Sequence, residues 1–215
     1  MTRNFTMLPI LAALLTSGCL QKETTHTLYI EPGGAVEWVA VERTVHSDLQ
    51  ERAAREAEEQ AYIRSAAENS HDIARALLAL GPEGPIMTRV ARAHRPYTVI
   101  TNARYDSLER VLARLFHESG LPAVVSLSTA DGQTTLTIAL DFRAPEAGRE
   151  SPVDALLHDV DRFGFVLTDG TFVAATGFQF GGVEARLTEA WLKEAAAACE
   201  EGTTIALSLT WTTGG

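Results

Sequence analysis

The chain has 215 residues, of which 46% are hydrophobic and 21% are charged, and its formal net charge is −10 at pH 7. This hydrophobic fraction suffices for a folded core and excludes a disordered chain. The acidic balance disfavours general binding to nucleic acid, so no nucleic-acid partner is predicted.

The first nineteen residues read MTRNFTMLPILAALLTSGC. Arg3 supplies a positive charge, an apolar run follows from Met7 to Leu15, and small residues precede Cys19. This is the layout of a secretory signal peptide. The apolar run is about ten residues long, well short of the ~20 that a transmembrane helix needs.

The cysteine that closes this segment makes it resemble the leader of bacterial lipoproteins, with Thr16 at a position where that family prefers leucine. The resemblance implies that residues 1–18 are a signal peptide cleaved between Gly18 and Cys19, and that Cys19 carries acyl chains into a membrane. Two or three such chains would anchor the protein stably, since each buried CH₂ contributes about 0.8 kcal/mol. Leu20 in place of aspartate implies the outer membrane, on its periplasmic side, in a Gram-negative source. An ordinary cleaved signal peptide is the alternative.

Beyond the leader, polar residues 19–26 predict a short tether, and residues 27–215 predict a single domain. Two strands, 27–30 and 35–44, are expected around the turn Pro32-Gly33-Gly34. A helical region should begin at Ser47, and a shorter helix should end before the run from Gly81 to Pro85.

Strands at 86–93 and 97–103 come next, followed by a strongly periodic helix that starts near Asp106. The pair Asp131-Gly132 predicts a β-hairpin. A helix from Pro152 to about Arg162 precedes a second predicted hairpin at Asp169-Gly170.

A last helix, from about Thr188 to Glu200, should bury Cys199, and the final strand alternates through Trp211. The order helix, strand, Asp-Gly, strand occurs at 106–142 and again at 152–180, which would fit a weak duplication. The predicted fold class is therefore α+β: an antiparallel sheet built from hairpins, with about four or five helices packed on it.

Standard catalytic motifs are absent from the sequence: it has no GxxxxGK[ST], GxSxG, HExxH or CxxC pattern. His158 and Asp161 lie three apart on a predicted helix and could supply two metal ligands. A zinc site needs three or four, so a solvated helix face is the favoured interpretation. No metal, cofactor or catalytic residue is predicted.

A basic stretch is the candidate binding site, because planar guanidinium groups bind phosphate or carboxylate bidentately. It would take the anionic groups of an envelope glycan, although the same arginines could equally be matched to acids of the protein itself. Five phenylalanines around Asp169-Gly170 are interpreted as core rather than as a ligand groove. The arginines are Arg89, Arg92, Arg95 and Arg104, and the phenylalanines are Phe163, Phe165, Phe172, Phe178 and Phe180.

Together these features predict a lipid-anchored envelope lipoprotein whose domain is a non-enzymatic binding module for an envelope protein or an anionic glycan. The alternative is a membrane-tethered extracytoplasmic hydrolase, with acid/base or metal residues that are dispersed in the sequence and meet only in the fold.

Overall fold

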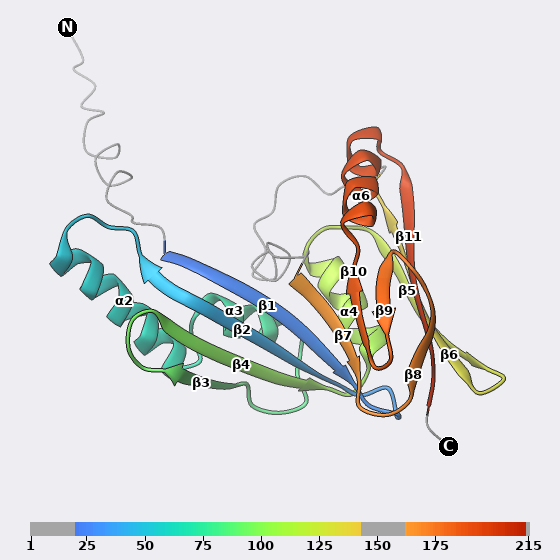
Figure 1. Ribbon diagram of the computed structural model, residues 1–215, viewed down its shortest axis with the longest axis horizontal. Helices are drawn as coiled ribbons and strands as arrows, with labels where there is room; N and C mark the ends of the chain where they lie inside the picture. Colours follow the sequence, from blue (N-terminus) through green and yellow to red (C-terminus); the bar gives the residue numbers. More distant parts are fainter. Residues whose placement is uncertain (1–19, 143–161, 214–215) are drawn as a thin grey trace, which may run out of the picture.

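The computed structural model describes residues 20–142 and 162–213. Their strands form two sheets (Figure 1). The large sheet has the order β3-β4-β2-β1-β7-β10-β9, and the small sheet has the order β5-β6-β11-β8. The strands are β1 (Leu20–Ile30), β2 (Val36–Ser47), β3 (Met87–Arg92), β4 (Tyr97–Tyr105), β5 (Ala123–Ala130), β6 (Gln133–Asp141), β7 (Phe163–Leu167), β8 (Thr171–Thr176), β9 (Phe178–Gly181), β10 (Glu184–Leu187) and β11 (Thr204–Thr212).

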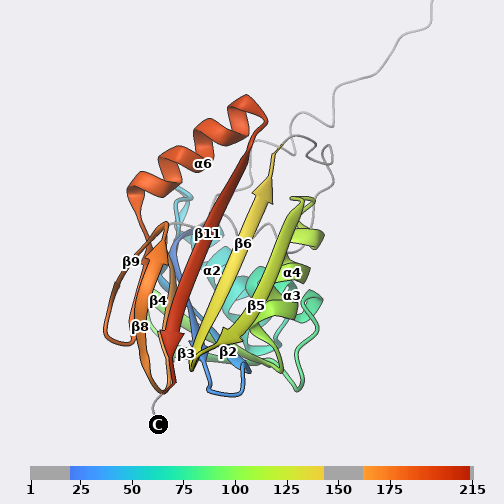
Figure 2. The ribbon, with the colours of Figure 1, turned by 90° about the vertical axis from the view of Figure 1, so that its right-hand side faces the viewer.

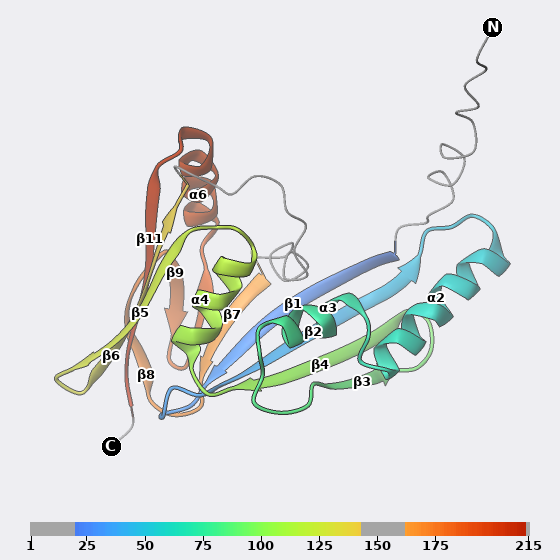
Figure 3. The same ribbon diagram turned by 180° about the vertical axis from the view of Figure 1, so that it is seen from behind.

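Helices cover parts of both sheets. Figure 3 shows α2 and α3 on one face of the large sheet. The helix α4 packs against β5, and α6 contacts β11. The helices are α2 (Arg52–Ala67), α3 (Asp72–Ala79), α4 (Leu108–Glu118) and α6 (Glu189–Glu201).

The predicted fold, one antiparallel sheet with four or five packed helices, is wrong. Strands predominate, and they are divided between two extended sheets. The large sheet is also mixed, because β1 pairs in parallel with β7, from His26 opposite Phe163 to Ile30 opposite Leu167. These two strands are more than 130 positions apart in the chain. Alternation within a strand reveals its buried face but not its neighbour, so the sequence could not supply this pairing.

The two Asp-Gly turns have different outcomes. Asp131 and Gly132 adopt positive φ angles of 52° and 74° and join β5 to β6 in the predicted hairpin. At the second turn the flanking strands do not pair: β7 belongs to the large sheet and β8 to the small one. The turn is therefore a crossing between sheets, and the second unit of the suggested duplication does not repeat the hairpin of the first.

The segment predicted as a tether is part of the fold. β1 begins at Leu20, which pairs with Ser47 at the end of β2. β2 extends to Ser47, so α2 begins at Arg52 rather than at Ser47. Residues 20–26, predicted as a tether, are therefore part of a paired strand.

One hydrophobic cluster spans both sheets, because the inward faces of the large and small sheets pack against α4. Trp38 and Leu28 of the large sheet, Leu115 of α4, and Leu136 and Leu209 of the small sheet belong to it. A smaller cluster lies under α2. In the described ranges no helix is both long and apolar enough to cross a bilayer.

Candidate functional site: an apolar cavity and a buried polar cluster

An apolar cavity of about 350 Å³ lies between the two sheets, at α4 and α6. Its volume is more than twice the ~150 Å³ of an engineered protein cavity that stays dry and binds benzene, and it falls in the range of ligand pockets. The side chains that line it are Leu112, Leu115, Phe116, Leu121, Ile138, Leu140, Phe142, Phe163, Phe165, Phe178, Leu187, Trp191, Leu192, Ala195, Ala196 and Leu207.

Local sequence explains how these walls are placed. α4 presents its leucines on one face, and its N-terminus is capped by Ser107, whose side chain accepts a hydrogen bond from the backbone N–H of Arg110. The sequence had predicted a start near Asp106, and the helix begins at Leu108. At the other wall, a side chain at Gly177 would lie 2.4 Å from Leu207 and 2.8 Å from Trp191. Glycine at this position therefore allows the indole ring to pack there.

Trp191, one of the lining residues, has a buried polar group. Trp191 is only 6% exposed, and its indole Nε1 has no hydrogen-bond partner among the described residues. A buried donor without a partner costs about 1–3 kcal/mol.

A buried polar cluster lies on the same inward face of the large sheet, between the main hydrophobic cluster and the smaller one. Its centre is Glu42 of β2, whose carboxylate is 2.6 Å from Lys22 Nζ and 3.3 Å from His71 Nε2. Thr101 Oγ1 is 3.2 Å from the same His71 nitrogen. The members of the cluster are Lys22, His26, Glu42, Tyr62, His71 and Thr101.

His26 joins this cluster to the aromatic core. Its Nδ1 accepts a 3.2 Å hydrogen bond from Trp38 Nε1. The centroid of its ring lies 4.6 Å from the ring centroid of Phe163. Burial lowers the pKa of His26 to about 4, with a smaller lowering from Lys22 and an opposing effect of Glu42. This histidine is therefore neutral at neutral pH.

A hydrogen bond from His71 and the charge of Lys22 keep the carboxyl of Glu42 ionised. Burial by itself would raise the pKa of its carboxyl, but hydrogen bonding by His71 and the charge of Lys22 outweigh it and bring the pKa to about 2. The pKa of Tyr62 is raised by burial and by the charge of Glu42. Glu42 is therefore an ionised carboxylate held by a cation.

A carboxylate beside an imidazole is an arrangement that general acid–base catalysis uses. Here, however, Glu42 is 0% exposed and His71 is 3% exposed, so neither is open to a substrate. The geometry supports a structural role, in which the cluster fixes α3 and α2 on the sheet.

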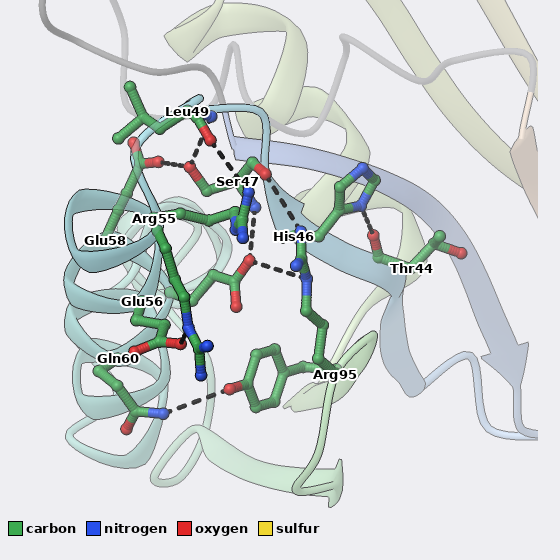
Figure 4. A network of polar contacts seen from close by, with 12 residues as sticks. Thr44, His46, Ser47, Leu49, Arg55, Glu56, Glu58, Gln60 and Arg95 are labelled. Carbon is green, nitrogen blue, oxygen red and sulfur yellow. Dashed lines mark hydrogen bonds and ion pairs between the residues drawn. The ribbon is translucent and has the colours of Figure 1, made fainter.

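Among the predicted anion-binding arginines, Arg95 binds groups of the protein itself. Its Nε lies 3.1 Å from Glu59 Oε1, which also accepts a 3.0 Å hydrogen bond from the backbone N–H of Ser47 (Figure 4). Arg95 also donates to the carbonyl of Ser47 at 3.4 Å. These contacts tie the β3–β4 turn to the end of β2 and to α2.

The four arginines are not gathered into one group. Arg104 lies near the opposite end of β4 from Arg95 and binds Glu31 through both Nη atoms. Arg89 and Arg92 are exposed on β3, where Arg92 Nε donates to His94 at 3.3 Å. Anion binding by this stretch stays a prediction, which now rests on Arg89 and Arg92.

Several sequence-based sites lie outside the described residues: Gly18, Cys19, His158 and Asp161. Cleavage and lipidation therefore stay predictions. Within residues 20–142 and 162–213 no three His, Cys, Asp or Glu side chains meet closely enough to hold a metal ion. Cys199 is exposed, so its predicted burial is wrong.

Sequence reasoning missed the buried polar cluster, although a signal existed. In β2, Glu42 has the same parity as Val36, Trp38 and Ala40, so an acid occupies the inward face. The partner of that acid, His71, comes from a distant helix cap and could not be identified. The phenylalanines around Asp169-Gly170 were interpreted as core, and this is wrong for Phe180, which is 40% exposed. The other four are buried, and Phe163, Phe165 and Phe178 also line the cavity.

Comparison with known proteins leaves the family open. No family model matches the chain, and no curated protein matches it. Among solved structures, it is similar to the NMR structure of the folded domain of LppM from Mycobacterium tuberculosis. The TM-score is 0.37, the sequence identity is 8%, and the match covers 93% of each chain.

Proposed function

We propose that this protein is a lipid-anchored envelope protein whose domain holds the acyl chain of a lipid in the apolar cavity. The observation that carries this proposal is the cavity itself: about 350 Å³, partly open to solvent and lined by aliphatic and aromatic side chains from both sheets and two helices. A hydrocarbon chain gains about 0.8 kcal/mol for each CH₂ removed from water, and this cavity offers it an apolar environment.

The lining of the cavity favours an acyl chain, because it offers aliphatic and aromatic contacts and contains no charged side chain. The ligand class that fits this lining is a fatty acid or the acyl chain of a lipid ester.

The leader supports a membrane location for this activity. If Cys19 is acylated, the domain starts without a tether, because Leu20 is already paired in β1. The domain would then lie directly at the membrane, next to a supply of acyl chains. By the resemblance to bacterial lipoproteins this membrane would be the outer one of a Gram-negative source.

A hydrolytic function is not favoured, because the acid–base pair Glu42–His71 is closed to solvent. The anchored binding module is the better fit to the described residues.

The cavity can be tested by filling it. We would titrate the mature full-length protein with cis-parinaric acid, a fluorescent fatty acid, and with phospholipid vesicles as a second source of acyl chains. Ala195 lines the cavity, whereas its neighbour Ala197 is exposed and does not. Ala195→Phe should weaken binding at least about tenfold, and Ala197→Phe should leave it unchanged.

Absence of fatty-acid binding by the parent protein, or equal loss in both alanine variants, would overturn the proposed function.

The anchor has its own test. The parent chain should incorporate labelled palmitate and sediment with membranes, and Cys19→Ala should lose both properties. Retention of label in Cys19→Ala would refute attachment at this residue.

A further inference from the structure

Among residues 20–142 and 162–213, each of the two sheets has two edge strands, and three of these four edges are protected. Native proteins block free edges with charges, bulges or short strands, because an open edge pairs with other chains. β3 carries Arg89 and Arg92 and has a shift of register between Val90 and Arg92. β9 has four residues, and the pairing of β8 with β11 has a register shift.

The edge strand β5 has none of these devices. Its eight residues, AVVSLSTA, contain no charge, proline or glycine, and its pairing with β6 runs without a register shift. Among the described residues, its backbone hydrogen bonds go to β6 alone. The N–H and C=O groups on its other side are therefore available for a further strand.

Apolar side chains of β5 are also incompletely buried. Val124 is 70% exposed. On the inward face, Val125 and Leu127 are half-buried, whereas Leu136 of the adjacent β6 is 1% exposed. A strand added beside β5 would cover the half-buried side chains of β5, as neighbouring strands already cover Leu136 of β6.

The outer face next to this edge is nearly free of charge. Figure 2 shows that face of the small sheet towards the viewer, with no helix over it. Three rows of paired residues on this face consist of Val124 and of small or hydroxyl side chains, and the acid Asp141, at the end of β6, lies outside these rows. The rows are Val124, Ala139 and Ala206; Ser126, Thr137, Ser208 and Thr176; and Ser128, Thr135, Thr210 and Ala174.

We propose that two copies of this chain pair through β5 in antiparallel orientation, joining their small sheets into one continuous eight-stranded sheet. A second copy fits better than another partner for two reasons. Identical antiparallel strands are related by a two-fold axis, so the contact is self-complementary and closes after two subunits. The protein carries a net charge of −10, and an uncharged strand is where two such copies approach without repulsion between like charges.

Cysteine cross-linking tests the pairing in the full chain. Opposed residues of antiparallel strands have Cα atoms about 4.5–5.5 Å apart, which is within the reach of a disulfide. In a Cys199→Ser background, single cysteines would be placed at the outward positions Val124, Ser126 and Ser128. The parent without an added cysteine reports any background from Cys19.

We expect rapid disulfide-linked dimers with a maximum at one or two neighbouring β5 positions. Ala174→Cys and Thr176→Cys, on the opposite edge of the same sheet, are the matched controls and should remain monomeric on denaturing gels. Cross-linking as strong on β8 as on β5 would overturn the proposal.

A second measurement uses charge. Ser126→Glu combined with Ser128→Glu places like charges across the two-fold axis, so it should weaken the dimer at least about tenfold in sedimentation equilibrium. Ala174→Glu with Thr176→Glu should leave it intact. A monomeric parent, an unaffected Ser126/Ser128 variant, or open-ended filaments in place of dimers would each refute pairing through β5.

Discussion

Replacing His26 by asparagine should remove most of the loss of stability that the protein undergoes between pH 7 and pH 5. His26 is 1% exposed and accepts a hydrogen bond from Trp38 Nε1. Asparagine can offer a carbonyl oxygen to the same indole N–H, but it does not titrate. The substitution therefore removes the titration of residue 26 while keeping an acceptor for the hydrogen bond from Trp38.

The size of the effect follows from the pKa. Burial lowers the pKa of His26 from its ordinary value of 6.5 to about 4, so the unfolded chain binds a proton in a range where the native protein does not. The stability contributed by neutral His26 is complete above pH 6.5 and is lost as the pH falls towards 4. Integrated from pH 7 to pH 5, the loss is about 2 kcal/mol.

Glu42 does not contribute in this window. Its pKa is depressed from 4.5 to about 2, so the stability it provides is present above pH 4.5 and is lost only between pH 4.5 and pH 2. Acid should therefore weaken the fold in two stages, first through His26 and then through Glu42.

Urea unfolding at pH 7, 6 and 5 measures the first stage. The free energy of unfolding should fall by about 2 kcal/mol in the parent and in His94→Asn, whose histidine is exposed, and by less than about 0.5 kcal/mol in His26→Asn. The comparison uses the change with pH, since His26→Asn also lowers stability at pH 7 through lost packing. An unchanged pH slope in His26→Asn would show that this histidine is not the group responsible.

Two further predictions concern the fold. Glu42→Gln should lower the free energy of unfolding at pH 7 by about 3 kcal/mol, because it leaves Lys22 without its buried counter-charge. The control Glu56→Gln removes an exposed partner of Arg52 and should change the free energy of unfolding by less than about 1 kcal/mol. Similar losses in the two variants would contradict the role given to the buried polar cluster. Gly170→Ala should destabilise by well over ~1 kcal/mol, since its φ is +91° and the added Cβ would lie 1.8 Å from the carbonyl oxygen of Thr212. Gly132 has a similar φ of +74° but open space around it, so Gly132→Ala measures the cost of backbone strain alone. Equal effects of the two substitutions on thermal unfolding would refute the steric argument.

The elements themselves could largely be predicted, because helices and strands leave a local period in the sequence. Within the described ranges, most strands, the α4 helix and the Asp131-Gly132 hairpin follow from alternation, from helical spacing and from a turn that needs two positive φ angles, whereas β10 was not predicted. The boundaries were less accurate: β1 and β2 are longer than predicted, at the expense of the tether and of the start of α2.

The candidate site could be predicted only in part. The acid on the inward face of β2 was visible as an exception to the alternation, but the histidine that meets it is the cap of α3 and the lysine is on β1. The cavity takes its walls from strands and helices between Leu112 and Leu207, and no local pattern indicates that they enclose a space.

The sequence by itself determined the acidic charge, the leader that resembles those of lipoproteins, most of the elements and the tight turn at Asp131. Only the tertiary structure decided that β1 lies beside β7, that Asp169-Gly170 crosses between sheets, and that β5 is left as an unprotected edge. The physical reason is that periodicity and turn geometry act over a few residues. Pairing of strands and enclosure of a cavity depend instead on which distant surfaces pack together at the lowest free energy.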